Sequence, residues 1–228
     1  MGLAAVLSCA VLGSLSLAVQ RSTQPEPTAK AGAERSPWVM RLPAMQAVFV
    51  VMLGIGGVFG SMEIVTVGFA SANGSRGASG LLLAIWGVSS LVSGLVYGAL
   101  TIRIPLHRRF PLAVAAFALG LLPLTLAGDL LTLTPLLILA GVSMSWAMII
   151  AIEVIQRVVP ETSLTEGIAW SSGGTGFGMT LGSTAGGWVI DAFGADRGYI
   201  VPAAFGVLGL LIALISRRII KAGCEPCA

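Results

Sequence analysis

Long apolar blocks alternate with short polar stretches along the whole chain. Each block is close to the roughly 20 residues that an α-helix needs to cross about 30 Å of hydrocarbon. The buried core of a soluble protein would instead give shorter blocks, each with a helical polar stripe. We therefore predict seven membrane-spanning helices, at about Gly2–Val19, Pro43–Ala70, Gly80–Thr101, Pro111–Ala127, Thr132–Gln156, Leu164–Ile190 and Tyr199–Ser216.

The polar stretch after the first block is long and contains several prolines, among them Pro25 and Pro27. Such a stretch is typical of a flexible linker. No basic residue precedes the first block, which favours a membrane span over a signal peptide. We expect an all-α polytopic membrane bundle with four parts: a helix at 1–19, a cytoplasmic linker at 20–42, a six-helix bundle at 43–216 and a cytoplasmic tail at 217–228.

The composition agrees with a membrane protein. Hydrophobic residues make up 56% of the 228 positions and charged residues only 10%, whereas about 25% of a soluble domain is charged. A net charge of +3 would fit nucleic-acid binding, but the cations lie between the apolar blocks, where they orient membrane helices. We expect the lipid bilayer as a partner and no nucleic acid.

The basic residues gather on one side of the predicted membrane. If the linker is cytoplasmic, only Arg76 and Arg197 lie outside. This asymmetry predicts a cell-membrane protein with its N-terminus outside and its C-terminus in the cytoplasm. The cytoplasmic cations are then Arg21, Lys30, Arg35, Arg41, Arg103, Arg108, Arg109, Arg157, Arg217, Arg218 and Lys221.

Glycines recur every four residues in the sixth block, at Gly174, Gly178, Gly182 and Gly186. At 3.6 residues per turn they form a smooth ridge that lets another helix backbone approach closely. The ridge predicts helix packing. Static packing and a surface on which helices slide during transport both remain open.

The start of the sixth block carries a capping signal. Pro160 breaks the preceding helix, and Ser163 and Glu166 have the spacing of a capping box. We therefore expect the Ser163 side chain to accept a hydrogen bond from the first turn of that helix.

Ionisable residues inside spans are costly and are therefore the best candidates for a site. Glu63 lies in the second span, roughly 9 Å from the bilayer centre at 1.5 Å per residue. No cation lies within one helical turn of it. A carboxyl group in a cavity would serve proton coupling or the binding of a cationic substrate. The alternative is a structural hydrogen bond to a neighbouring helix.

Two further candidates lie in the fifth span. Glu153 is near its cytoplasmic end, four residues before Arg157, and this spacing favours a surface ion pair over a site. Trp146 could line a substrate pocket, although helix packing is the simpler interpretation.

Signs of enzymatic chemistry are missing from the sequence, which has no GxSxG, HExxH or GxxxxGK[ST] motif and a single histidine, His107. Cys224 and Cys227 form a CxxC pair near the C-terminus, but zinc would need two more ligands. We expect no enzyme, no cofactor and no metal site.

Several segments together resemble the C-terminal half of a major facilitator superfamily transporter. A polar linker follows one span and precedes six. Gly98–Arg109 (GALTIRIPLHRR) resembles the family loop motif G-x-x-x-D-R-x-G-R-R without its aspartate, and Gly186–Gly194 (GGWVIDAFG) resembles the end of family helix eleven. RVVPETSLTEGIAW, at 157–170, is similar to the preceding loop of bacterial efflux-type members.

The resemblance implies a function and a site. It implies that the second and fifth spans line the substrate cavity, with Glu63 and Trp146, and that the glycine ridge faces the other half of the transporter. It implies a secondary active transporter of a small organic solute, or its C-terminal half, working by proton-coupled efflux and alternating access. The partner would be an N-terminal half or a second subunit. The alternative is a truncated, non-transporting membrane subunit that packs with a partner half.

Overall fold

The computed structural model describes residues 11–12, 38–100 and 104–224. The chain divides into two units, Met1–Arg35 and Ser36–Ala228, and the fold below is that of the second. Its described part contains helices and no strands, which confirms the predicted all-α class. The α-helices are α2 (Pro43–Ala72), α3 (Ala78–Ala99), α4 (Leu106–Leu121), α5 (Leu130–Val158), α6 (Leu164–Phe193), α7 (Ile200–Ile215) and α8 (Arg217–Cys224).

Short 3₁₀ helices precede or join these α-helices. They are η2 (Val39–Arg41), η3 (Leu122–Leu126), η4 (Glu161–Ser163) and η5 (Ala195–Arg197). The expected first span and most of the expected linker lie outside the described residues. The expected tail at 217–228 begins with α8, and its last four residues lie outside the described part of the chain.

Within the described residues, five helical segments are long and apolar enough to cross a membrane: Pro43–Ala72, Ala78–Ala99, Leu106–Leu126, Leu130–Val158 and Ala195–Ile215. The predicted span at Leu164–Ile190 is not among them. Its helix, α6, has 30 residues, but many of its positions hold glycine, serine or threonine instead of an aliphatic residue. These residues lower the mean hydropathy of α6. Helix α6 nevertheless packs alongside the apolar helix α2.

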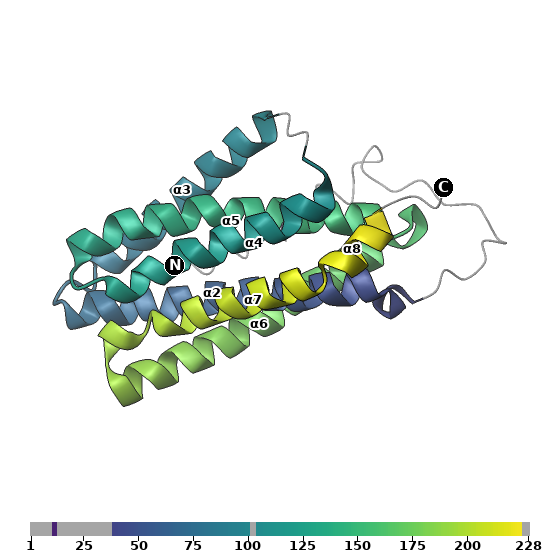
Figure 1. Ribbon diagram of the computed structural model, residues 1–228. Helices are drawn as coiled ribbons and strands as arrows, with labels where there is room; N and C mark the ends of the chain where they lie inside the picture. The colour runs from purple at the N-terminus through teal and green to yellow at the C-terminus, as the bar shows by residue number, and fades with distance from the viewer. Residues whose placement is uncertain (1–10, 13–37, 101–103, 225–228) are drawn as a thin grey trace. The chain divides into compact units, whose positions relative to one another are not determined.

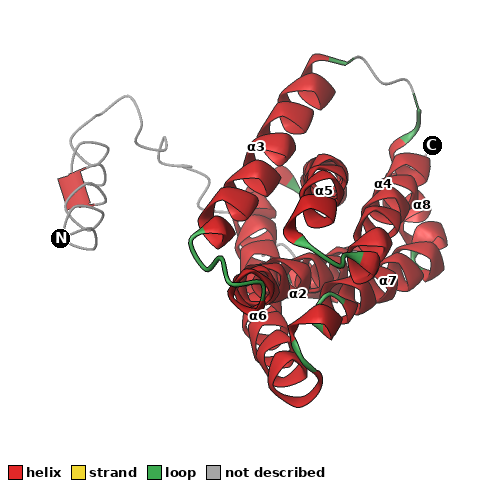
Figure 2. Cartoon of the chain, turned by 90° about the vertical axis from the view of Figure 1, so that its left-hand side faces the viewer, coloured by secondary structure: helices red, strands yellow, loops and turns green. Residues whose placement is uncertain are grey.

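Helix α2 is the centre of the bundle, and 67% of its most apolar stretch is buried. It packs against α6 and α7 along its length and also contacts α3 and α5. Figure 1 shows α2, α7 and α6 lying along a common direction. Seen from the side in Figure 2, α5 lies between α3 and α4.

The contact between α2 and α6 is made by backbone. A Cβ atom on Gly178 would lie 2.0 Å from the carbonyl oxygen of Leu53, and one on Gly182 would lie 2.0 Å from that of Gly57. Four residues on, Gly186 faces Ser61 at 3.4 Å. Both partners advance by four residues at each step, so the two helices run parallel with their backbones in contact.

The glycine ridge therefore packs inside this bundle. All four of its glycines, from Gly174 to Gly186, are buried, and the implied contact with another half of the transporter is wrong for this face of α6. The reason lies on α2, where Gly56 and Gly60 approach the carbonyl oxygens of Thr175 and Met179 equally closely. Small residues on both helices allow a mutual approach that neither helix could make with a bulkier neighbour.

Serines join α3 to α5. The Ser90 and Ser145 hydroxyls lie 2.7 Å apart, and the Ser93 hydroxyl donates to the carbonyl oxygen of Val142 at 2.9 Å. In an apolar layer such bonds replace the hydrophobic drive that holds helices together in water. The pairing keeps α3 on the bundle although only 17% of its apolar stretch is buried.

The capping box occurs at a different helix from the one predicted. Ser163 precedes α6 but makes no side-chain cap, because the 3₁₀ turn at Glu161–Ser163 leads directly into the helix and the Glu161 carbonyl oxygen accepts the Leu164 amide. Asp129 instead caps α5, accepting from the Thr132 amide at 2.7 Å. This bond, followed by one from the Thr132 hydroxyl, lowers the pKa of the Asp129 carboxyl below its ordinary value.

The basic loop predicted at 102–110 is shorter than expected. Helix α4 begins at Leu106, so Arg108 and Arg109 lie on its first turn and a half. Pro111 lies inside this helix, in its second turn, where it removes one backbone hydrogen bond.

The α2–α6 contact predicts a large difference between neighbouring glycines. Gly182→Ala would force the backbones apart and lower the free energy of unfolding by about 1–3 kcal/mol. Gly176→Ala meets open space on the same helix and is expected to be neutral or stabilising by up to about 1 kcal/mol. Thermal unfolding of the detergent-solubilised protein, followed by tryptophan fluorescence, measures both. Equal melting temperatures for the two variants would contradict the contact.

Candidate functional site

Glu63 is an exposed carboxylate on the most deeply buried helix of the bundle. Met62 and Val65 beside it are completely buried, whereas Ile64 is 39% exposed. The structure gives Glu63 no hydrogen bond or ion pair among the described residues. An acid on an otherwise apolar membrane helix needs a proton, water or a cation, so this position can take up any of them.

An aromatic pair lies next to Glu63, toward the middle of helix α2. Phe59, one turn earlier on α2, packs edge-to-face on Trp86 of α3 with ring centroids 5.2 Å apart. Trp86 is only 7% exposed, and its indole N–H has no hydrogen-bond partner in the described part of the chain. The carboxylate thus borders an apolar, aromatic wall.

Trp146 belongs to a second cluster. Its ring lies 6.1 Å from that of Tyr97, on α3. Both line a cavity of about 180 Å³ between α3, α4 and α5. Trp146 is 37% exposed, so part of the ring remains open to a ligand. The other residues lining this cavity are Ile104, Arg109, Leu112, Ala113, Ala116 and Ile150.

Glu153 forms an ion pair with Arg109, one of the residues lining this cavity. The side chain of Arg109 is 12% exposed and that of Glu153 is 38% exposed. The expected pair between Glu153 and Arg157 is wrong, because the carboxylate turns toward α4 while Arg157 stays exposed without an ion pair among the described residues. An almost buried guanidinium gains more from the carboxylate than an exposed one would.

The three predicted acid and aromatic residues therefore fall into two groups. Trp146 and Glu153 meet around Tyr97 and Arg109. Glu63 is not among the residues that line this cavity. Because the two groups lie apart, Glu63 can bind a proton or cation while the Glu153 group holds α4 against α5.

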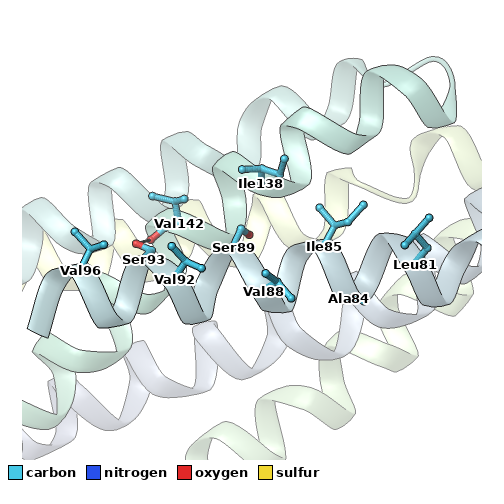
Figure 3. Close-up of a pocket in the computed structure, with 10 residues that line it drawn as sticks. All are labelled: Leu81, Ala84, Ile85, Val88, Ser89, Val92, Ser93, Val96, Ile138 and Val142. Atoms are coloured by element: carbon cyan, nitrogen blue, oxygen red, sulfur yellow. Dashed lines mark hydrogen bonds between the residues drawn. The ribbon is translucent and has the colours of Figure 1, made fainter.

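An apolar groove of about 620 Å³ lies on α3 and α5. Figure 3 shows its residues from Leu81 to Val96 along α3, with Ile138 and Val142 facing them from α5. Its two serines already donate hydrogen bonds, Ser89 to Trp86 and Ser93 to Val142. The described residues that line the groove carry no charge and no spare donor, so the groove suits an apolar helix or lipid better than a polar solute.

Sequence reasoning missed Arg109 and Tyr97 as members of a site. Arg109 was counted only among the cations that orient the chain, and Tyr97 was not singled out. One signal was available: a carboxylate in a span needs a partner, and Arg109 lies at the same predicted end of the membrane as Glu153. Nothing in the sequence marks Tyr97, which reaches the cavity through the crossing of α3 and α5.

The sequence model of the Major Facilitator Superfamily matches residues 44–222. The matched segment begins in α2 and ends in α8, so it covers every long helix described above. A comparison with curated proteins finds no match.

The Arg109–Glu153 pair predicts a stability difference between two charge removals. Glu153→Gln removes the carboxylate that Arg109 contacts and is expected to lower the free energy of unfolding by about 1–3 kcal/mol, less than for a fully buried pair because Glu153 is partly exposed. Arg157→Gln, at an exposed position one turn away, should change it by less than about 0.5 kcal/mol. Chemical unfolding in detergent measures both free energies. A larger loss of stability for Arg157→Gln than for Glu153→Gln would support the Glu153–Arg157 pair expected from the sequence.

Proposed function

Because the chain belongs to the major facilitator superfamily, we propose that it carries a small organic solute across the cell membrane as a proton-coupled exporter, or as the C-terminal half of one. The family makes it a membrane transporter. Its substrate class, coupling ion and direction are the proposal, and they rest on one observation: the exposed carboxylate of Glu63 on the central helix α2.

One carboxylate can hold a proton or a cationic solute, but not both. A protonated Glu63 is neutral and fits the apolar wall of Phe59 and Trp86. Once ionised, it attracts a cation, and the aromatic rings add cation–π and apolar contact. If the two compete for the same group, a proton entering from outside displaces the solute. An inward proton gradient then drives efflux.

In this proposal the cluster around Trp146 forms part of the substrate chamber and holds two helices together. The cavity beside Trp146, about 180 Å³, is smaller than the roughly 300 Å³ of the smallest drug-sized pockets. It is therefore one wall of a larger chamber that another helical body completes. The ion pair of Arg109 and Glu153 holds α4 to α5 at that wall.

A partner body is supported by the exposed face of α3. Leu81, Leu91 and Leu95 are between 62% and 68% exposed, and they extend the apolar groove. An N-terminal half or a second subunit would cover this face. The same observation supports the second candidate function, a membrane subunit that packs with a partner half and carries nothing itself.

Glu63→Gln should abolish proton-driven export. The amide keeps the size of the side chain but cannot exchange a proton or balance a cation. Proteoliposomes containing the full chain, loaded with ethidium as the cationic probe and given an imposed pH gradient, are expected to release the dye at least tenfold more slowly with this variant. Glu161→Gln, in the exposed turn before α6, is the matched control and should release dye at the wild-type rate.

The two candidate functions give different results in this assay. A wild-type protein that releases no dye in response to the gradient supports the non-transporting subunit. Equal gradient-driven release by wild type and Glu63→Gln keeps transport but removes Glu63 from the coupling step.

The proposed orientation has its own test. After Cys9, Cys224 and Cys227 are replaced by serine, a single cysteine at Ser75, between α2 and α3, should react with a membrane-impermeant maleimide in intact cells. A cysteine at Glu161, between α5 and α6, should react only after permeabilisation. The opposite labelling pattern would reverse the orientation inferred from the basic residues.

A further inference from the structure

A pocket of about 230 Å³ lies where α4 begins and α7 ends. Helices α4 and α7 run antiparallel, because Gly206 approaches Ala118 whereas Gly209, further along α7, approaches Val114, which is earlier on α4. This brings the first turn of α4 beside the last turn of α7. The pocket is lined by Arg108, Pro111, Leu112, Ala115, Leu214 and Arg217.

The pocket has a charged end and an apolar end. On α4, Arg108, Leu112 and Ala115 follow the spacing of one helix face, and they descend about 10 Å along the helix at 1.5 Å per residue. On the other side, Leu214 lies one turn before Arg217. Both arginines therefore stand at the helix ends, and the apolar side chains continue toward the middle of the bundle.

The two arginines are available to a ligand. Arg108 and Arg217 are exposed, and within the described residues neither forms an ion pair. None of the described residues that line the pocket is a carboxylate. Two cations facing one small space repel each other unless an anion lies between them.

The apolar end is open to the lipid side. Leu112 is 60% exposed and Leu214 is 51% exposed, so hydrocarbon can reach both. At about 230 Å³ the pocket is too small to enclose a drug-sized solute. Its size and shape fit a compact anionic group with an attached apolar chain.

We propose that this pocket binds an anionic phospholipid. The phosphate lies between the guanidinium groups of Arg108 and Arg217, which offer paired N–H donors to its oxygens. One acyl chain follows Leu112, Ala115 and Leu214 into the membrane. The lipid then bridges α4 and α7 at the end of the bundle, on the face away from the groove of α3. This site is independent of the transport proposal and needs no substrate.

Native mass spectrometry of the delipidated full chain in detergent tests the proposal. Dioleoyl phosphatidylglycerol and dioleoyl phosphatidylcholine are titrated separately, and bound lipid is counted on the folded protein. We expect tighter binding of phosphatidylglycerol. Arg108→Gln with Arg217→Gln should weaken it roughly 25-fold, at about fivefold for each basic residue. Arg108→Lys with Arg217→Lys should keep most of the affinity.

The matched control is Arg157→Gln, which removes another exposed arginine that has no ion pair in the described part of the chain but leaves the pocket unchanged. It should bind phosphatidylglycerol as the wild type does. Equal binding of the two lipids by the wild type would overturn the proposal, as would an equal loss in the control and the double variant. Inorganic phosphate and glycerol 3-phosphate should displace the lipid only weakly. Full displacement by either would show an anion site that makes no use of the acyl chain.

Discussion

The direct backbone contact between α2 and α6 is the constraint on which the rest of the bundle depends. At Gly178 and Gly182 the two helices are so close that a single methyl group would lie 2.0 Å from a carbonyl oxygen. This contact holds the least apolar of the long helices against the central one. With α6 in place along one face of α2, and α7 along another, only a narrow strip of α2 stays open. Glu63 lies on that strip.

Electrostatics follows from this packing. A bundle with so few charges can bury a cation only where a carboxylate meets it, and Arg109 and Glu153 meet across α4 and α5. Glu63 has no such partner among the described residues, which leaves its carboxylate to a proton or a solute. Among the described residues, the pocket of the two arginines beside α7 has no carboxylate either, and these arginines stand at the helix ends, where we propose that a lipid phosphate binds.

The amount that could be predicted differs between elements. The helices at Pro43–Ala72 and Leu130–Val158 were expected within a few residues, because an apolar block of membrane length has few other structures open to it. The start of α6 at Leu164 was expected, but the side-chain cap at Ser163 was wrong, since a serine with capping spacing does not reveal that a 3₁₀ turn already accepts the Leu164 amide. Glu63 and Trp146 stay predictions, Glu63 from its charge inside a span and Trp146 from its ring and the family resemblance. Their separation into different clusters was not predictable.

By itself, the sequence determined the helical class, the apolar segments and the presence of a close-packing ridge, because these depend on residue spacing within a single helix. The tertiary structure decided which surface the ridge faces and which cation Glu153 contacts. Arg109 is 44 residues away from Glu153 in the sequence, whereas Arg157 is four residues away with a favourable spacing. Packing of α4 on α5 brought the distant arginine into a more buried position, where the same charge interacts more strongly.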